Sequence, residues 1–310
     1  MNFFPMKKIN TGLEISSDKI RSALVIRQRN NSFIKKLFDV TLSENIIKPS
    51  FKKENIVDVK AFQDALKIIN KEINLKKIGV ALPDSSVKVL IRTFKELPKK
   101  AQEIDEMVLW NISSSIDLPA KDIRGSWKNN GKNADNNYVF LIVFGLEKII
   151  SQYEDVLKEV GISPLMIGPS GLSQFNFYSP VVPDKGNVAY LGLFDDLLNI
   201  FVFSEGIPVF YKIIKKGILG NQNVSTINDV DLLMQYYKSE NPDIEIKQFF
   251  IASHIKSRLR MTQVLQEAGQ YNFTIIDERQ LIGFDIRFKI RPENNPLPFY
   301  SNVLGAAQSL

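Results

Sequence analysis

The stretch from residue 186 to residue 211 constrains the fold most strongly, because it reads as three consecutive β-strands. Two apolar runs, 188–193 and 197–203, flank an acidic corner, and a third run, 207–214, follows a turn at Gly206. The runs are rich in Val, Ile, Phe and Tyr, which pack well on a pleated surface. Glycine gives a tight turn the backbone freedom that it needs. The stretch therefore predicts a three-stranded meander.

A second, weaker copy of this pattern opens the chain. Three β-prone runs, 11–15, 20–27 and 33–42, are separated by polar turns, and a helical segment follows each meander. The two copies start about 175 residues apart, and a repeat of that kind predicts a duplicated architecture of two domains.

Composition excludes several classes of site. The chain has 310 residues, 44% of them apolar, which is enough for two hydrophobic cores. It has no cysteine, which excludes disulfides and thiolate metal sites, and its one histidine, His254, excludes a histidine-rich metal site. The chain starts without a signal-peptide pattern, and no apolar run approaches the roughly 18 residues of a membrane span. We therefore expect a soluble protein that is not exported.

The formal charge of +6 comes from lysines that stand in scattered pairs at the ends of the expected elements. Scattered pairs are typical of a solvated surface. An anionic membrane surface or an acidic partner is the next interpretation. Nucleic acid is the least favoured partner, because it calls for a clustered basic face.

Hydrophobic periodicity alternates helices and strands along the rest of the chain. The expected helices are 57–72, 99–116, 146–160, 170–178, 228–239, 257–268 and 299–310, and the expected strands are 77–82, 86–94, 122–128, 138–145, 162–167, 247–253 and 273–276. Residues 129–137 are rich in asparagine and glycine, so we expect a loop there.

A proline-rich stretch, 179–186, has the composition of a linker and marks a boundary between two α/β domains. The predicted organisation is a first domain of residues 1–84 and 162–182 closed by the C-terminal helix 299–310, a small α+β subdomain of residues 85–161 inserted in it, and a second domain of residues 183–298.

Several phrases of the chain resemble one family. A strand ends at Pro83, a second strand leads to the turn Leu97-Pro98, a helix carries Trp110 near its end, and Pro119 closes the next loop. These features, with the phrases EDVLKEVGISPLMIGPSGLS and SEGIPVFYKI, are similar to the PilM family of type IV pilus assembly and to the related FtsA and type II secretion L proteins. The resemblance covers nearly the whole chain.

The resemblance implies an actin-like fold, which is a ribonuclease H-like duplicated α/β fold, with the inserted subdomain given above. It also implies a scaffold in a pilus or secretion platform, cytoplasmic and peripheral to the inner membrane, with contacts to a motor ATPase and to further copies of itself. The implied partner is the cytoplasmic tail of a PilN-like bitopic membrane protein, bound in a groove between the first domain and the inserted subdomain. An extended or helical peptide would place apolar anchors there, and the candidate residues are Val87, Val89, Ile91 and Trp110.

The nucleotide motifs of this family are altered in the chain. In the family, two hairpin corners carry an acid and a glycine that organise metal and phosphate, and a glycine-rich strand end accepts the adenosine. The altered positions are Glu14 and Ser16 at the first corner, Gly192 and Phe194 at the second corner, and Ser253 and His254 at the strand end. We therefore expect a degenerate protein with no nucleotide cofactor and no metal, which does not hydrolyse ATP.

An active ATP-binding ATPase with atypical phosphate loops is the alternative. In that case Glu14 would act on a water, Asp195 and Asp196 would hold Mg²⁺, and His254 would touch an anion. The structural interpretation of the same residues is a set of turn acids and a histidine that caps a strand end. Stabilisation of the folded chain by nucleotide separates the two interpretations.

Overall fold

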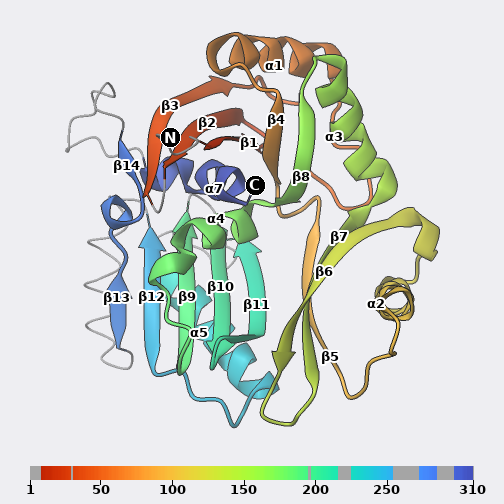
Figure 1. The fold of residues 1–310 in the computed structure, drawn as a ribbon, viewed down its shortest axis with the longest axis vertical. Coiled ribbons are helices and arrows are strands. Elements are labelled where there is room, and N and C mark those ends of the chain that lie inside the picture. Colours follow the sequence, from red (N-terminus) through yellow and green to blue (C-terminus); the bar gives the residue numbers. More distant parts are fainter. Residues whose placement is uncertain are drawn as a thin grey trace, which may run out of the picture.

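Two twisted sheets, with helices between them and on their outer faces, form most of the molecule (Figure 1). The computed structural model describes residues 8–28, 31–194, 197–215, 225–253, 272–284 and 297–309. The helices that face these two sheets are α1 (Val59–Ile73), α3 (Glu147–Glu159), α4 (Ser170–Tyr178), α5 (Ser225–Glu240) and α7 (Leu297–Gln308). None of the described helices combines the length and the apolar surface that a membrane span requires.

The first sheet has six strands in the order β14-β3-β2-β1-β4-β8. Their bounds are β1 (Lys8–Ile15), β2 (Lys19–Gln28), β3 (Asn31–Thr41), β4 (Lys77–Leu82), β8 (Ser163–Pro169) and β14 (Gly283–Phe284). Strands β1 to β3 form the predicted antiparallel meander, and β4 and β8 join it in parallel. One face of the sheet packs on α1 and α3, where Phe62, Leu66 and Tyr153 are fully buried.

Helix α1 has a capping residue at each end. The Asp58 carboxylate accepts a hydrogen bond from the backbone N–H of Ala61 at 2.9 Å, which satisfies a donor of the first turn. After Ile73, Asn74 adopts a left-handed backbone with φ 57° and ends the helix. Because α1 ends here, it leaves the part of the sheet around Thr11 open to a surface cavity.

The second sheet has five strands in the order β11-β10-β9-β12-β13. Their bounds are β9 (Asn187–Phe194), β10 (Leu197–Ser204), β11 (Ile207–Lys215), β12 (Gln248–Ser253) and β13 (Phe273–Ile275). Strands β9 to β11 are the second predicted meander, and both of their pairings are antiparallel. Helix α5 covers the outer face of this sheet through Val230, Leu233 and Tyr237.

Helices α4 and α7 lie between the two sheets (Figure 1). A Cβ atom on Gly305 of α7 would lie 1.7 Å from the carbonyl oxygen of Ser173 in α4. A Cβ atom on Gly12 of β1 would lie 2.1 Å from the carbonyl oxygen of Val303 in α7. Close approach of backbones therefore requires glycine at both positions, and α7 fastens the end of the chain to the first sheet.

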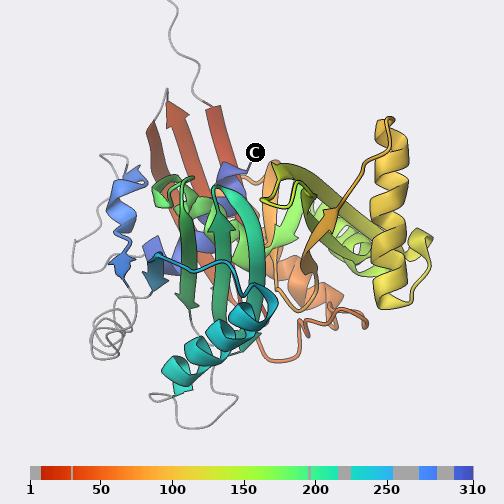
Figure 2. The same cartoon turned by 90° about the horizontal axis from the view of Figure 1, so that it is seen from below.

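The segment between β4 and β8 forms a separate three-stranded sheet in the order β5-β7-β6. Its elements are β5 (Lys88–Phe94), α2 (Ala101–Ile116), β6 (Ile123–Lys132) and β7 (Tyr138–Leu146). Helix α2 packs on one face through Val108 and Ile112 and lies at the outer side of the molecule (Figure 2). A short 3₁₀ turn at Ala120–Asp122 joins α2 to β6, and two more occur outside this segment at Ser179–Val181 and Glu278–Gln280.

The structure corrects several of the expected elements. The prediction of a loop at 129–137 is wrong over its first part, because β6 continues to Lys132 through an irregularity at which Gly131 takes φ 98°. The last helix begins at Leu297, two residues before the expected start. The helix expected at 257–268 lies outside the described residues.

Strand β14 lies inside the range 183–298 expected for the second domain, yet it pairs with β3 of the first sheet. Two residues carry no readable strand pattern, so only this pairing reveals them as a strand. The domain boundaries themselves stay a prediction.

Candidate functional site

At the corner between β1 and β2, the two candidate residues are bonded to the protein itself. Glu14 is 4% exposed, and its carboxylate accepts hydrogen bonds from Arg21 Nη1 at 3.1 Å and from Asn302 Nδ2 of α7 at 2.6 Å. The Ser16 hydroxyl donates to the carbonyl of Lys19 at 2.9 Å and accepts from its N–H at 3.2 Å. The acid is thus part of a buried ion pair, and the serine closes its own turn.

The second corner is occupied in a similar way. Gly192 lies in β9, and a Cβ atom there would lie 2.3 Å from Oε1 of Gln174, a residue of α4. Gln174 also accepts a hydrogen bond from Tyr190 Oη at 3.1 Å and donates one to Asn302 Oδ1 at 3.0 Å. The glycine at this corner therefore makes room for a side chain of the central helix.

Some of the predicted residues are described only in part. The backbone of Phe194 ends β9 opposite Leu197, but the Phe194 side chain, Asp195, Asp196 and His254 lie outside the described residues. Ser253 is fully buried at the end of β12. Within the described ranges, no group of three or more His, Cys, Asp or Glu residues is placed to hold a metal. The hypothesis that the two aspartates bind Mg²⁺ stays untested.

A further acid, which the sequence pattern did not single out, lies at the junction of the two sheets. Asp84 follows β4, and its two carboxylate oxygens lie 3.0 and 3.1 Å from the backbone N–H of Gly171, the second residue of α4. A helix N-terminus attracts anions, because its N–H groups point outward and carry partial positive charge. The chain's own carboxyl group fills this position, and burial raises the pKa of Asp84 to about 7. The available signal in the sequence was an acid two residues after the end of a buried strand.

Two side chains of the second sheet reach the same helix end. Asn199 Nδ2 of β10 donates to the carbonyl of Gly171 at 2.9 Å, and Tyr211 of β11 places its hydroxyl 2.9 Å from the position of a Cβ on Gly171. Burial, and then the nearby Asp84 carboxylate, raise the pKa of Tyr211. In the described part of the chain, Asn199 Oδ1 and the Tyr211 hydroxyl are buried without a hydrogen-bond partner. Gly171 thus bonds both to Asp84, which follows β4 of the first sheet, and to Asn199 of the second sheet.

A different kind of site lies between the inserted subdomain and the first sheet. A cavity of about 160 Å³ is walled by β6 and β7 on one side and by β8 and α3 on the other, with Val87, Ile150 and Met166 among its apolar residues. Among the described residues, β6 pairs only with β7, and β8 pairs only with β4. Both β6 and β8 are therefore edge strands of their sheets, and both contribute residues to the lining of the cavity. We call this site the β6–β8 groove.

Strand β8 carries a bulge at this groove. Its register with β4 shifts so that Ile78 pairs with Pro164 and Gly79 pairs with Met166, which leaves Leu165 as an extra residue. Leu165 lines the groove and is 59% exposed. Bulges at sheet edges redirect a side chain and interrupt pairing, so the extra residue presents an exposed leucine to the groove.

Charged residues form one rim of the groove. Arg124 of β6 contacts the carboxylates of Glu147 and Glu154, the latter at 2.8 Å. The hydrogen bond from Arg124 lowers the pKa of the Glu147 carboxyl. Lys158 lies 3.6 Å from the Glu154 carboxylate as well, so the acids of this rim are paired with basic residues and Arg124 is held in place.

The four predicted partner-binding residues lie in three different places. Val87 lines the groove. Val89 and Ile91 lie in β5 and do not line it; Ile91 packs against the core between the two sheets. Trp110 lies in α2 and is 69% exposed, and it does not line the groove either. Of these four residues, the structure therefore brings only Val87 to this site. It adds Leu165 and Met166, whose only signal in the sequence was that they are apolar residues of the strand expected at 162–167.

No family model and no curated protein matches the chain. Solved structures do match it. A structure described as the PilM-PilN type IV pilus biogenesis complex aligns with a TM-score of 0.75 and 12% identity over 97% of this chain and 98% of that chain. The cytoplasmic domain of EpsL, an inner membrane component of the type II secretion system of Vibrio cholerae, aligns with a TM-score of 0.53 and 10% identity over 98% and 96% of the two chains.

A third structure, from Bacteroides thetaiotaomicron, is described as a protein with actin-like ATPase fold and unknown function. It aligns with a TM-score of 0.52 and 9% identity over 98% of both chains. At these identities the likeness shows the fold. The chain has the actin-like fold that the sequence resemblance implied.

Proposed function

We propose that this actin-like chain is a non-catalytic scaffold of a type IV pilus or type II secretion-like platform, on the cytoplasmic side of the inner membrane. In this proposal it binds the cytoplasmic tail of a PilN-like membrane protein. The likeness in fold to PilM, which was solved in a complex with PilN, and to the cytoplasmic domain of EpsL supports this class of machine.

The observation that carries the proposal is the β6–β8 groove. An extended peptide adds to a sheet edge through backbone hydrogen bonds, while alternate side chains enter pockets. The groove offers both requirements, because β6 and β8 have free edges among the described residues and Leu165 and Met166 are apolar. A short tail with apolar anchors in an extended conformation fits this chemistry.

The proposal of a non-catalytic role rests on what fills the positions where phosphates would lie. Glu14 is bonded to Arg21 and Asn302, Gln174 occupies the space beside Gly192, and Asp84 accepts from the N-terminus of α4. A phosphate group would have to displace each of these groups.

A thermal-shift titration with Mg-ATP and Mg-ADP up to millimolar concentration tests the non-catalytic role. We expect no change in melting temperature. A ligand at 100 times its dissociation constant would stabilise the fold by about 2.7 kcal/mol, which moves the transition by several degrees. A shift of that size would show instead that the chain is a nucleotide-binding protein with atypical loops.

Fluorescence anisotropy with labelled peptides tests tail binding. The probes are the cytoplasmic tails of bitopic membrane proteins from the same assembly system. Leu165→Asp should weaken binding at least tenfold, because it places a charge at the apolar part of the groove. Trp110→Asp makes the same change at an exposed residue that does not line the groove and should leave affinity unchanged. The reverse pattern would show that the tail binds at α2.

A further inference from the structure

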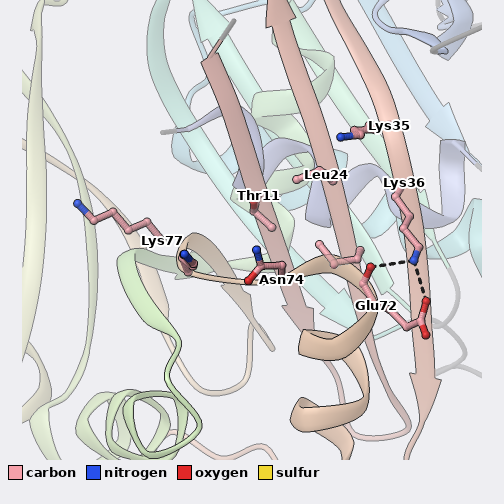
Figure 3. A pocket seen from close by; sticks show the side chains of 9 residues that line it. Thr11, Leu24, Lys35, Lys36, Glu72, Asn74 and Lys77 are labelled. Atoms are coloured by element: carbon pink, nitrogen blue, oxygen red, sulfur yellow. Dashed lines mark hydrogen bonds and ion pairs between the residues drawn. The ribbon is translucent and has the colours of Figure 1, made fainter.

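A second cavity, of about 590 Å³, lies where α1 ends and the first sheet is uncovered (Figure 3). Buried Thr11 of β1 and half-buried Leu24 of β2 line it, together with Ile73 at the end of α1. The remaining lining includes four lysines from two separate segments, Lys35 and Lys36 of β3 and Lys76 and Lys77 at the start of β4. We call this site the lysine cavity.

The cavity has an excess of positive charge. Its one carboxylate, Glu72, accepts from Lys36 Nζ at 2.7 Å, and the same Nζ donates to the backbone carbonyl of Glu72 at 2.8 Å (Figure 3). Lys36 is therefore engaged in ending α1. Lys35, Lys76 and Lys77 are exposed, and none of the carboxylates in the described part of the chain forms an ion pair with them. Three lysines without such an ion pair thus line a partly apolar cavity, and the side chain of Lys77 extends away from Thr11 and Leu24 (Figure 3).

The lysine cavity adjoins the β6–β8 groove. Lys77 is the register partner of Ser163, and the next pair is Ile78 with Pro164, a residue that lines the groove. The two linings share no residue, but they come close to each other where β4 and β8 begin.

We propose that the lysine cavity binds the phosphates of anionic lipid headgroups and so holds the groove beside the bilayer, where the tail of a membrane partner emerges. A lysine ammonium is a compact charge on a flexible stem, while arginine suits fixed, bidentate recognition. The cavity is lined by lysines and by no arginine, which fits a fluid array of phosphates better than an ordered acidic peptide. The inference deepens the proposed function and rests on it only for the position of the partner.

Sedimentation of the full chain with vesicles tests the inference. The probes are phosphatidylcholine vesicles and vesicles of phosphatidylcholine and phosphatidylglycerol in a roughly 7:3 ratio at about 0.1 M salt, where exposed charges still interact. The wild type should bind only the anionic vesicles. The variant Lys35→Glu/Lys76→Glu/Lys77→Glu should bind them about a hundredfold more weakly, since each lysine near an anionic surface contributes about fivefold in affinity. Lys36 is kept, because it holds the end of α1.

A matched control variant makes the same change in net charge at a different part of the surface. Lys95→Glu/Lys99→Glu/Lys121→Glu changes three exposed lysines of the inserted subdomain and should weaken vesicle binding by less than tenfold. Equal losses in the two variants would overturn the inference, because attraction would then follow the overall charge of +6. Wild-type binding to both vesicle types, or to neither, would overturn it as well.

Two further measurements distinguish lipid binding at the lysine cavity from binding of a soluble phosphate compound and from tail binding in the groove. Stabilisation of the wild type by millimolar inorganic phosphate, absent in the cavity variant, would assign the site to a soluble phosphate compound and overturn the lipid assignment. Leu165→Asp should keep wild-type vesicle binding while it loses the tail peptide. The peptide assay and the vesicle assay can therefore fail independently of each other.

Discussion

The junction around Gly171 and the β6–β8 groove differ in how their polar groups are used. Near the junction, Glu14 accepts from Asn302 of α7, and Asp84 and Asn199 bond to Gly171 of α4. In the groove, strand edges are unpaired within the described residues and Leu165 is exposed. Side chains of the chain itself thus occupy the space between the two sheets. The chain has left open a place between the first sheet and the inserted subdomain.

The largest expected loss of stability follows from a change in the packing of α7 against α4. Gly305→Ala would place a Cβ atom 1.7 Å from the Ser173 carbonyl oxygen, so α4 and α7 must separate. We expect a loss of about 4 kcal/mol in the free energy of unfolding, or no folded protein. Urea unfolding measures it. Gly168→Ala, in β8 beside the groove, meets no atom within 4 Å and should change stability by no more than about 0.5 kcal/mol. Equal effects would mean that the central helices are not tightly packed.

The next largest effect concerns the buried ion pair. Glu14→Gln should cost about 3 kcal/mol, because Arg21 loses its carboxylate in a site where the two side chains are 5% and 11% exposed. The double variant Glu14→Gln/Arg21→Gln should cost less than the sum of the two single changes. Additive losses in urea unfolding would show that the pair is not coupled.

A smaller effect should appear as a pH dependence. Burial raises the pKa of Asp84 from 3.8 to about 7, so the folded state favours the protonated acid. That contribution to stability is complete below pH 3.8 and is lost as the pH rises through about 7. Asp84→Asn removes the titrating group while its amide oxygen still accepts from Gly171. The free energy of unfolding of this variant relative to wild type should therefore be greater at pH 8 than at pH 5, by about 2 kcal/mol. A difference that does not vary with pH would show that Asp84 is ionised throughout this range.

The smallest effect on stability is expected in the groove. Leu165→Ser should change the free energy of unfolding by no more than about 0.5 kcal/mol, because the leucine is 59% exposed. A loss above about 1.5 kcal/mol, which is typical of burying an apolar side chain, would show that Leu165 packs in the folded chain.

Local patterns predicted most of the elements. Both meanders are confirmed, as are helices such as α1 and α3, because alternation, helical spacing and caps are properties of short segments. The prediction of a loop at 129–137 was wrong over its first part, because β6 continues to Lys132 through Gly131, which has a positive φ. Strand β14 was missed because its partner β3 lies far away in the sequence.

By itself, the sequence determined the two meanders, the segment between β4 and β8 and the residue types at the two hairpin corners. The tertiary structure decided which groups fill the junction between the two sheets. Asp84 is hydrogen-bonded to Gly171, which is 87 positions away in the sequence, and Glu14 is hydrogen-bonded to Asn302, which is 288 positions away. It also decided that Val87 lines a groove while Trp110 does not, and that lysines of two segments share a cavity. The physical reason is that strand pairing and helix packing bring distant side chains within bonding distance, and no local pattern encodes that distance.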